Sequence, residues 1–404
     1  MPSGLCQPPG QPKNASVSLS GNLFADRTFQ GLEKEDVSPM AKNREQLVLD
    51  VIRRKNTNYL PSVVNFANLR KKMECAAYLG ITDEAEYDEY LGNHYRFTYT
   101  TDDACGNGMD DTEKVQLALS SGRAHELPNG HYVDPWGMEY DPHATSYFNY
   151  GHPLAEVADD PEVLENFRAP ALDDMDLQFR YAQEDLKNSE GKVLCVLSGY
   201  NGIWEKTYDM MGLENFMITL MEEPEIIDRL FRIVTNYKIE IAKETVKRGF
   251  KLGHHGDDLG TQTSTFFSED VFVTYLKPRL RELFDVYHSA GIPVQMHSCG
   301  KISAFIPHLI DIGLDVLEPV QPVMDQEFLK REYGKDLIFY GGVDTQKLLA
   351  FGTPEEVYEG TLRTIDILGK GGGYIAGPAQ EIMDNVSPAN VDALVRAIRH
   401  VRGD

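Results

Sequence analysis

The chain has 404 residues, of which 42% are hydrophobic and 25% are charged; 63 acidic and 39 basic residues give it a formal net charge of −24. Such a chain can bury a large core without disulfide staples. The acidic balance argues against nucleic acid as a partner, because phosphate backbones are repelled. The five cysteines are widely spaced and form no CxxC pair, which argues against a zinc ribbon or a disulfide framework.

The first residues of the chain predict a flexible arm, and we expect the protein to be cytoplasmic. Residues 1–39 are rich in Pro, Gly, Ser and Gln, so they cannot bury enough apolar surface to order themselves. We predict a flexible arm here, or one that docks on a partner subunit. It lacks the basic start and apolar stretch of a signal peptide, and no run of about 18 apolar residues predicts a membrane span. An amphipathic helix from Met40 opens the domain predicted over residues 40–404.

Residues 61–170 predict an irregular insertion or lid. Aromatic and acidic residues crowd together over 83–99, and Pro128-Asn129-Gly130 predicts a turn before a strand pair in HYVDPWGMEY. Asp134 and Trp136 in this segment are candidates for a pocket wall, although simple packing is the more usual role of a tryptophan.

From about residue 190 short β-branched apolar runs alternate with helical stretches, which predicts βαβ units and a parallel sheet. A helix over 268–290 carries Pro278, which should kink it. Two more strands are predicted at 61–66 and 131–140, and eight strands would close a (β/α)8 TIM barrel. An open doubly wound sheet is the alternative, but no GxGxxG turn follows the first strand. The six regular strands are predicted at 193–199, 249–258, 292–300, 316–322, 337–344 and 372–378.

The segment MHSCG contains the strongest chemical signal. On a strand, His297 and Cys299 point the same way, and imidazole with thiolate suits zinc. Glu318 ends the next strand and is a third candidate ligand, since adjacent barrel strands end close together. The structural alternative is a buried cysteine beside a hydrogen-bonded core histidine, with Glu318 as a capping carboxylate.

Other strand ends are polar and predict a cleft. His255, Asp257 and Asp258 follow one strand, and Gln321 follows another. We predict that these four line the substrate pocket or act as acid and base. A solvated acidic turn is an equally ordinary explanation. We predict that four further residues at strand ends contact a cofactor: Asn201, Gly341, Gly342 and Asp344.

The segments MHSCGKISAFIPHLIDIGLDVLEPVQP, FYGGVDTQKLLAFGTPEEV and GGGYIAGPAQEI resemble the uroporphyrinogen decarboxylase superfamily over roughly residues 40–402. The resemblance implies a (β/α)8 barrel, and its methyltransferase branch implies zinc held by a His-x-Cys pair, a downstream cysteine and sometimes a glutamate. His297 and Cys299 match the pair and Glu318 the glutamate. Gln380 stands where the downstream cysteine would be, so we expect it beside the metal.

The leading hypothesis is a methyltransferase that moves a methyl group between a methylated small molecule, a corrinoid cofactor or protein, and a thiol. The resemblance implies zinc and a cobamide as cofactors and a corrinoid protein as partner, and a homodimer is expected. A decarboxylase of a porphyrin or another carboxylated substrate is the alternative, although the arginine-rich RQAGRY-like motif of true decarboxylases is missing. A barrel that binds a cobamide without catalysis is a third possibility.

Overall fold

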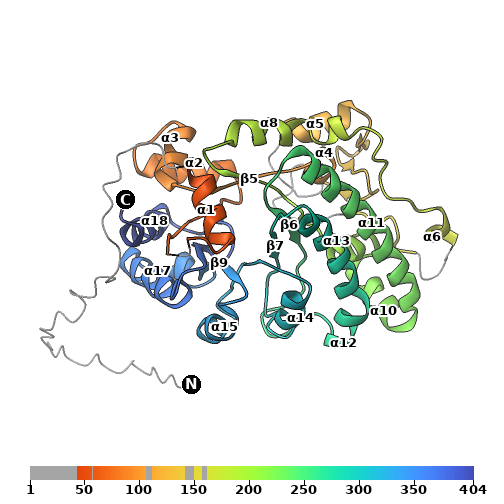
Figure 1. Ribbon diagram of the computed structural model, residues 1–404. Coiled ribbons are helices and arrows are strands. Elements are labelled where there is room, and N and C mark those ends of the chain that lie inside the picture. The colour runs from red at the N-terminus through yellow and green to blue at the C-terminus, as the bar shows by residue number, and fades with distance from the viewer. Residues whose placement is uncertain (1–42, 57, 106–111, 142–149, 157–161) are drawn as a thin grey trace, which may run out of the picture. The chain divides into compact units, whose positions relative to one another are not determined.

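The computed structural model describes residues 43–56, 58–105, 112–141, 150–156 and 162–404 (Figure 1). The arm predicted over residues 1–39 lies outside this part of the chain. None of the helices in the described part is long and apolar enough to cross a membrane.

Parallel strands dominate the described part, and all six strands predicted after residue 190 are confirmed. One sheet has the order β10-β9-β8-β7-β6, and a second pairs β1 with β5. The bounds are β1 (Tyr95–Thr98), β5 (Leu194–Leu197), β6 (Gly253–Gly256), β7 (Val294–His297), β8 (Val316–Glu318), β9 (Ile338–Val343) and β10 (Tyr374–Pro378).

A few backbone hydrogen bonds connect the two sheets. The Gly256 amide donates to the Gly199 carbonyl over 3.0 Å and links β6 to the end of β5. At the opposite edge of the five-stranded sheet, the Val63 amide donates to the Ala376 carbonyl of β10 over 2.9 Å. The His94 amide, just before β1, donates to the Ser62 carbonyl over the same distance. The segment predicted as a strand at 61–66 therefore bridges β10 and β1, although it forms isolated bridges and not a continuous ladder.

The strand predicted at 131–140 is not part of the parallel sheets, and this expectation was wrong. The segment forms an antiparallel sheet of β2 (His125–Glu126), β3 (Tyr132–Val133) and β4 (Glu139–Tyr140). Asp134 reverses the chain, because its carboxylate accepts hydrogen bonds from the Trp136 and Met138 amides at 2.8 and 2.9 Å. A strand that turns back after two residues cannot cross a barrel, and β1 takes that place beside β5.

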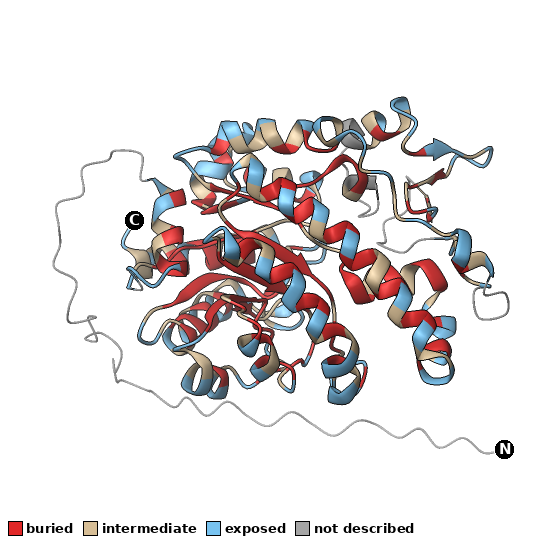
Figure 2. Cartoon of the chain, turned by 45° about the vertical axis from the view of Figure 1, so that its right-hand side comes forward, coloured by how far each residue is buried: buried red, intermediate tan, exposed pale blue. Residues whose placement is uncertain are grey.

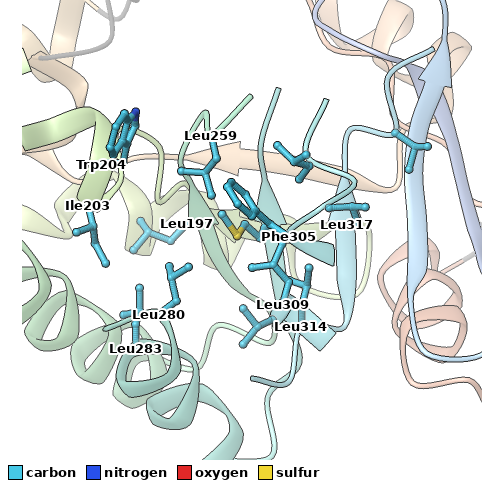
Figure 3. Packing of buried hydrophobic residues seen from close by; sticks show 14 of the residues in the cluster. Leu197, Ile203, Trp204, Leu259, Leu280, Leu283, Phe305, Leu309, Leu314 and Leu317 are labelled. Atoms are coloured by element: carbon cyan, nitrogen blue, oxygen red, sulfur yellow. The ribbon is translucent and has the colours of Figure 1, made fainter. Parts of the chain in front are cut away.

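Side chains alternate between two cores along the parallel strands. Leu194 and Val196 of β5 face an inner core that α1 also contacts, whereas Cys195 and Leu197 face an outer core between strands and helices. Figure 2 shows the strands buried at the centre, with exposed helix faces around them. Figure 3 shows the outer core, where Leu280 and Leu283 of a surrounding helix approach the strands. The period of two along each strand therefore decides which side chains enter the interior.

The helices follow the signals in the sequence. A π-helical turn, η1 (Phe272–Leu276), comes before Pro278, which confirms a disturbance at the predicted kink. Thr353 and Glu356 form a capping box at the start of α17. The bounds are α1 (Arg44–Ile52), α2 (Leu69–Tyr78), α3 (Glu84–Leu91), α4 (Thr101–Cys105), α5 (Thr112–Ser120), α6 (Glu162–Asn166), α7 (Met175–Gln178), α8 (Arg180–Ser189), α9 (Ile203–Met211), α10 (Leu213–Glu222), α11 (Pro224–Arg248), α12 (Glu269–Val271), α13 (Lys277–Ser289), α14 (Ile306–Asp311), α15 (Gln326–Tyr333), α16 (Leu348–Phe351), α17 (Pro354–Leu368) and α18 (Pro388–Arg402).

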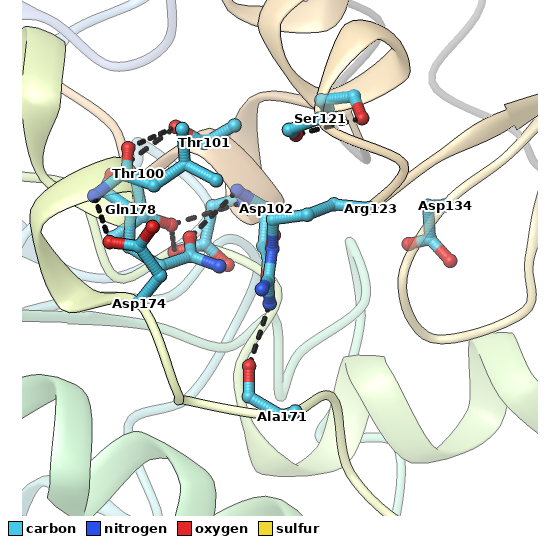
Figure 4. A network of polar contacts seen from close by, with 12 residues as sticks. Thr100, Thr101, Asp102, Ser121, Arg123, Asp134, Ala171, Asp174 and Gln178 are labelled. Atoms are coloured by element: carbon cyan, nitrogen blue, oxygen red, sulfur yellow. Dashed lines mark hydrogen bonds and ion pairs between the residues drawn. The ribbon is translucent and has the colours of Figure 1, made fainter.

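A buried ion pair ties the segment after β1 to the rest of the domain (Figure 4). Arg123 donates from Nε and Nη2 to the two carboxylate oxygens of Asp102, each over 2.6 Å. The Asp102 amide donates to Gln178 Oε1, and the Tyr237 hydroxyl of α11 reaches the carboxylate over 3.3 Å. The pair lies within the segment after β1, and the contacts with Gln178 and Tyr237 join that segment to α7 and α11.

Candidate metal centre

Three side chains that can bind a metal converge where β6 and β7 end. Asp258, His297 and Cys299 each offer a ligand atom, and these atoms all lie within 4.8 Å of one another. His297 Nε2 lies 3.4 Å from Asp258 Oδ1 and 3.5 Å from Cys299 Sγ. Tetrahedral zinc with ordinary bond lengths separates its ligand atoms by roughly 3.3 to 3.8 Å, so these spacings fit the ion.

The backbone after β7 holds Cys299 in this group. Its amide donates to Asp258 Oδ1 over 2.7 Å, which joins the β6 and β7 loops. Gly300 follows with φ +85°, and a Cβ there would lie 2.2 Å from the backbone of Gly260, so only glycine fits. Gln321 accepts from the Gly300 amide over 2.7 Å and donates to Cys299 Sγ over 3.3 Å. The predicted pocket residue Gln321 thus contacts the thiol directly.

Glu318 lies on the other side of the His297 ring. Its Oε1 is 3.5 Å from His297 Nδ1, whereas Asp258 and Cys299 face Nε2. The Tyr200 hydroxyl also lies 3.3 Å from Nδ1. Glu318 therefore occupies the position from which a carboxylate orients a metal-binding histidine.

A chain of hydrogen bonds inside the sheet fixes Glu318. The Gly199 amide donates to His254 Nδ1 over 3.0 Å, so the proton of this imidazole is on Nε2, 3.5 Å from Glu318 Oε2. Gln295 Nε2 also donates to Glu318 Oε2, and the Tyr95 hydroxyl holds Gln295 Oε1 over 3.0 Å. These donors hold Oε2 and leave Oε1 to His297.

The protonation of the group follows from these contacts. Burial alone would raise the pKa of Glu318, but the hydrogen bonds from His254 and His297 outweigh it and lower the pKa to about 2. Burial opposes the charge of His297, yet Cys299, Asp258 and Glu318 together raise its pKa well above the ordinary value. Burial and the charge of Asp258 raise the pKa of the Cys299 thiol.

Sequence reasoning assigned no role to four residues of this site: His254, Gln295, Tyr95 and Glu205. The first three share the interior face with His297, and the signal was the period of two, since His254 pairs with Gln295 in the β6–β7 register. Glu205 lies in the first turn of α9. Burial and the nearby charges of Asp258 and Asp257 raise the pKa of Glu205 well above its usual range.

Two of the predicted catalytic residues lie outside the metal group, which consists of Asp258, His297 and Cys299. Asp257 is buried, and its carboxylate accepts from the amides of Ile203, Trp204 and Glu205, each over 2.9 Å, so that it caps α9. His255 alternates with His254 and so faces the helices, with Nε2 3.4 Å from Asp257 Oδ2.

The remaining predicted residues are spread around the strand ends. Gly341 and Gly342 are buried within β9 with φ +82° and +106°, and a Cβ on Gly342 would lie 2.6 Å from Leu368. Asp344 Oδ1 accepts from the two amides that precede α16. Asn201 has φ +55° and a buried Oδ1 without a hydrogen-bond partner.

Gln380, predicted beside the metal, is exposed. Its neighbour Ala379 is closer to the group, because the Ala379 carbonyl lies 3.5 Å from Gln321 Nε2.

Comparison with known proteins identifies the family. Residues 136–401 match the family described as uroporphyrinogen decarboxylase (URO-D), and the chain belongs to it. It is similar to the methylated-thiol–coenzyme M methyltransferase of Methanosarcina mazei, with 25% identity over 193 residues that cover 46% of this chain and 48% of that protein. It is also similar to the methylcobamide:CoM methyltransferase MtaA of Methanosarcina barkeri, with 21% identity over 212 residues, 52% of this chain and 60% of that protein.

The chain thus spans about half the length of the first of these relatives. Among solved structures, a methyltransferase from Methanosarcina mazei matches with a TM-score of 0.56 and 17% identity, covering 88% of this chain and 98% of that chain. The family and this structural neighbour imply a TIM barrel, which agrees with the parallel strands and their connecting hydrogen bonds.

Proposed function

We propose that this protein is a zinc-dependent methyltransferase that moves a methyl group between a methylated small molecule, a corrinoid carrier and a thiol. The observation that carries the proposal is the convergence of Asp258, His297 and Cys299 at spacings that suit tetrahedral zinc. Both curated relatives are named as methyltransferases. We further propose that the strands close an eight-stranded barrel, with segment 61–66 as its first strand.

The residues of this chain would hold zinc through His297 Nε2, Cys299 Sγ and an Asp258 oxygen, and leave a fourth position open for a thiol. Zinc bound there supplies a positive charge that keeps a thiol deprotonated at neutral pH. Glu318 holds the Nδ1 proton of His297 and so leaves Nε2 free to bind metal. We therefore assign Glu318 an orienting role, in place of the ligand role that the sequence predicted.

Corrinoid binding and a corrinoid-protein partner rest on the relatives' names and remain part of the proposal. A decarboxylase of highly carboxylated porphyrins fits the site less well. Asp258 belongs to the metal group and Glu318 lies beside it, and their negative charges would repel a polyanionic substrate.

Metal content tests the proposal directly. We expect about one zinc per chain in the purified protein and a loss of most of it in Cys299→Ser, because serine is a poor zinc ligand. Cys195→Ser is the matched control, since Cys195 lies in the outer core and should keep the metal. A wild-type protein without metal after growth in zinc, or a Cys299→Ser variant with full zinc content, would contradict the assignment.

A further inference from the structure

A hollow on the surface of the domain is separate from the metal group. It is lined by residues of α3 and α17 and by the C-terminal part of α18 with the residue at its end, whereas the metal group follows β6 and β7 (Figure 1). Its volume of about 380 Å³ falls within the range of about 300 to 1,000 Å³ that is typical of ligand pockets. The residues that line it are Tyr90, Tyr358, Arg396, Arg399, His400 and Asp404.

Three basic residues of this hollow share one face of α18. Arg396, Arg399 and His400 are three and four residues apart, so they are neighbours on the helix surface. The helix dipole accounts for basic residues in the last turn, where Arg399 and His400 lie, but Arg396 precedes that turn. In a chain with a formal net charge of −24, three basic side chains around one hollow favour an anion as its ligand.

Arg399 is held in place without a carboxylate partner. Its guanidinium carbon lies 5.5 Å from the centre of the Tyr90 ring, and its Nη1 donates to the Tyr90 carbonyl oxygen over 3.3 Å. Among the described residues, no carboxylate forms an ion pair with Arg399, and its Nη2 forms no hydrogen bond. A guanidinium that is fixed by its face and by one N–H leaves the rest of its fork for an oxyanion.

The carboxylates beside the hollow are paired with other groups. Asp392 accepts hydrogen bonds from the Tyr90 hydroxyl and from Arg396 Nε, the second over 2.8 Å. Asp404 Oδ1 accepts from Arg402 Nε, also over 2.8 Å. Each of these two carboxylates therefore has an arginine of its own, and the charge of Arg399 is left over.

Two further donor groups line the hollow beside Arg399. In the described part of the chain, neither Nη atom of Arg396 forms a hydrogen bond, and its guanidinium carbon lies 6.0 Å from the centre of the Tyr358 ring. The Tyr358 hydroxyl is hydrogen-bonded to His400 Nδ1, and Nε2 of that imidazole has no partner among the residues described. When the hydroxyl donates to Nδ1, the neutral ring carries its proton on Nε2 and can donate it.

We propose that Arg396, Arg399 and His400 bind the phosphate group of a small molecule. A phosphate monoester offers three oxygens and a charge of about −1.5 to −2 at pH 7, so each of the three side chains can bind one oxygen. A carboxylate has two oxygens and would satisfy the fork of one arginine alone. Nucleic acid is an unsuitable source of the phosphate, because the acidic chain repels a phosphate polymer. The ligand is therefore a free phosphate or a phosphorylated metabolite, and its binding depends neither on the metal nor on methyl transfer.

Calorimetric titration of the full chain with inorganic phosphate, glycerol 3-phosphate and acetate tests the site. We expect a Kd of about 1 mM or tighter for at least one phosphate probe, and binding of acetate that is weaker by about tenfold or more, because acetate lacks the third oxygen. Tighter binding of glycerol 3-phosphate than of inorganic phosphate would identify a phosphorylated metabolite as the ligand, and the reverse or equal binding would identify the free anion. Absence of binding by both phosphate probes, or acetate that binds as tightly as they do, would overturn the proposal.

Arg399→Met removes the guanidinium but keeps an apolar stem, and should weaken phosphate binding about tenfold or more. His400→Ala, at an exposed position where folding is not at risk, should weaken it several-fold. The matched control is Arg363→Met, which removes the same charge from an exposed position of α17 outside the hollow. Unchanged binding in Arg399→Met or His400→Ala, or an equal loss in Arg363→Met, would reject the site.

Cys299→Ser separates this proposal from the metal proposal. The variant should lose zinc but retain phosphate binding, because Cys299 does not line the hollow. Loss of phosphate binding in Cys299→Ser would place the anion at the metal group and overturn the assignment to Arg396, Arg399 and His400.

Discussion

At the scale of single residues, the decisive feature is that the two nitrogens of the His297 ring face different partners. Asp258 and Cys299 face one ring nitrogen and Glu318 faces the other, although all are acidic or metal-binding side chains at strand ends. Asp258 lies 3.4 Å from Nε2 and Glu318 lies 3.5 Å from Nδ1, so a small shift of either carboxylate would change its role. The hydrogen bond from Gln295 and the charge contact with His254 hold the other oxygen of Glu318 and leave Oε1 to His297.

Replacement of Gln295 tests that arrangement. Gln295→Met removes the amide that holds Glu318 Oε2 and should weaken zinc binding by about tenfold, as loss of an outer partner of a metal ligand typically does. The measurement is zinc affinity by competition with a chelator, together with the absorption spectrum of the cobalt-substituted protein. Gln346→Met, at an exposed position, should leave both unchanged. An unaltered affinity and spectrum in Gln295→Met would show that Glu318 needs no such support.

At the scale of elements, His94 connects the segment at 61–63 to β1. Its Nδ1 lies 3.1 Å from the Ser62 amide, and the Tyr59 hydroxyl lies 2.9 Å from Nε2. Burial, with the charge of Arg402, lowers the pKa of His94 from 6.5 to about 3. The folded protein therefore holds this imidazole neutral, whereas the unfolded chain takes up a proton as the pH falls below 6.5.

The contribution of neutral His94 to the free energy of unfolding should decrease in mild acid. The stability that depends on neutral His94 is present above the unfolded pKa and is lost as the pH falls from there toward 3. Between pH 7 and about pH 5.5 we expect His94 alone to remove roughly 1 kcal/mol of the free energy of unfolding, measured by urea titration. His94→Gln cannot take up this proton, so its loss over the same interval should be smaller by that amount. Equal slopes for the two proteins would contradict the assignment.

At the scale of the whole molecule, the metal group connects loops that belong to neighbouring strands. Asp258 follows β6 and Cys299 follows β7, so zinc bound between them would be lost on unfolding. Free zinc at about a hundred times its dissociation constant should stabilise the folded state by roughly 2.7 kcal/mol. A rise in melting temperature in wild type and none in Cys299→Ser is the expected result of calorimetry. The same rise in both proteins would place the zinc elsewhere.

The sequence by itself determined the periodic features of this protein. Six parallel strands, the cap at Thr353, the disturbed helix before Pro278 and the pairing of His297 with Cys299 all follow from local patterns, because side-chain period and capping chemistry act over a few residues. The family resemblance rested on segments of the same kind, and the family match agrees with it.

Only the tertiary structure decided which strand ends meet and which of the two faces of each strand points to the interior. The sequence could not show that Asp258 faces the metal group while Asp257 caps α9, because the two residues are adjacent and chemically alike. Nor could it place β1 beside β5 in preference to the segment at 131–140, since short strands compete and the turn at Asp134 is decided by side-chain hydrogen bonds. Contacts between residues far apart in the chain depend on packing, which no local pattern records.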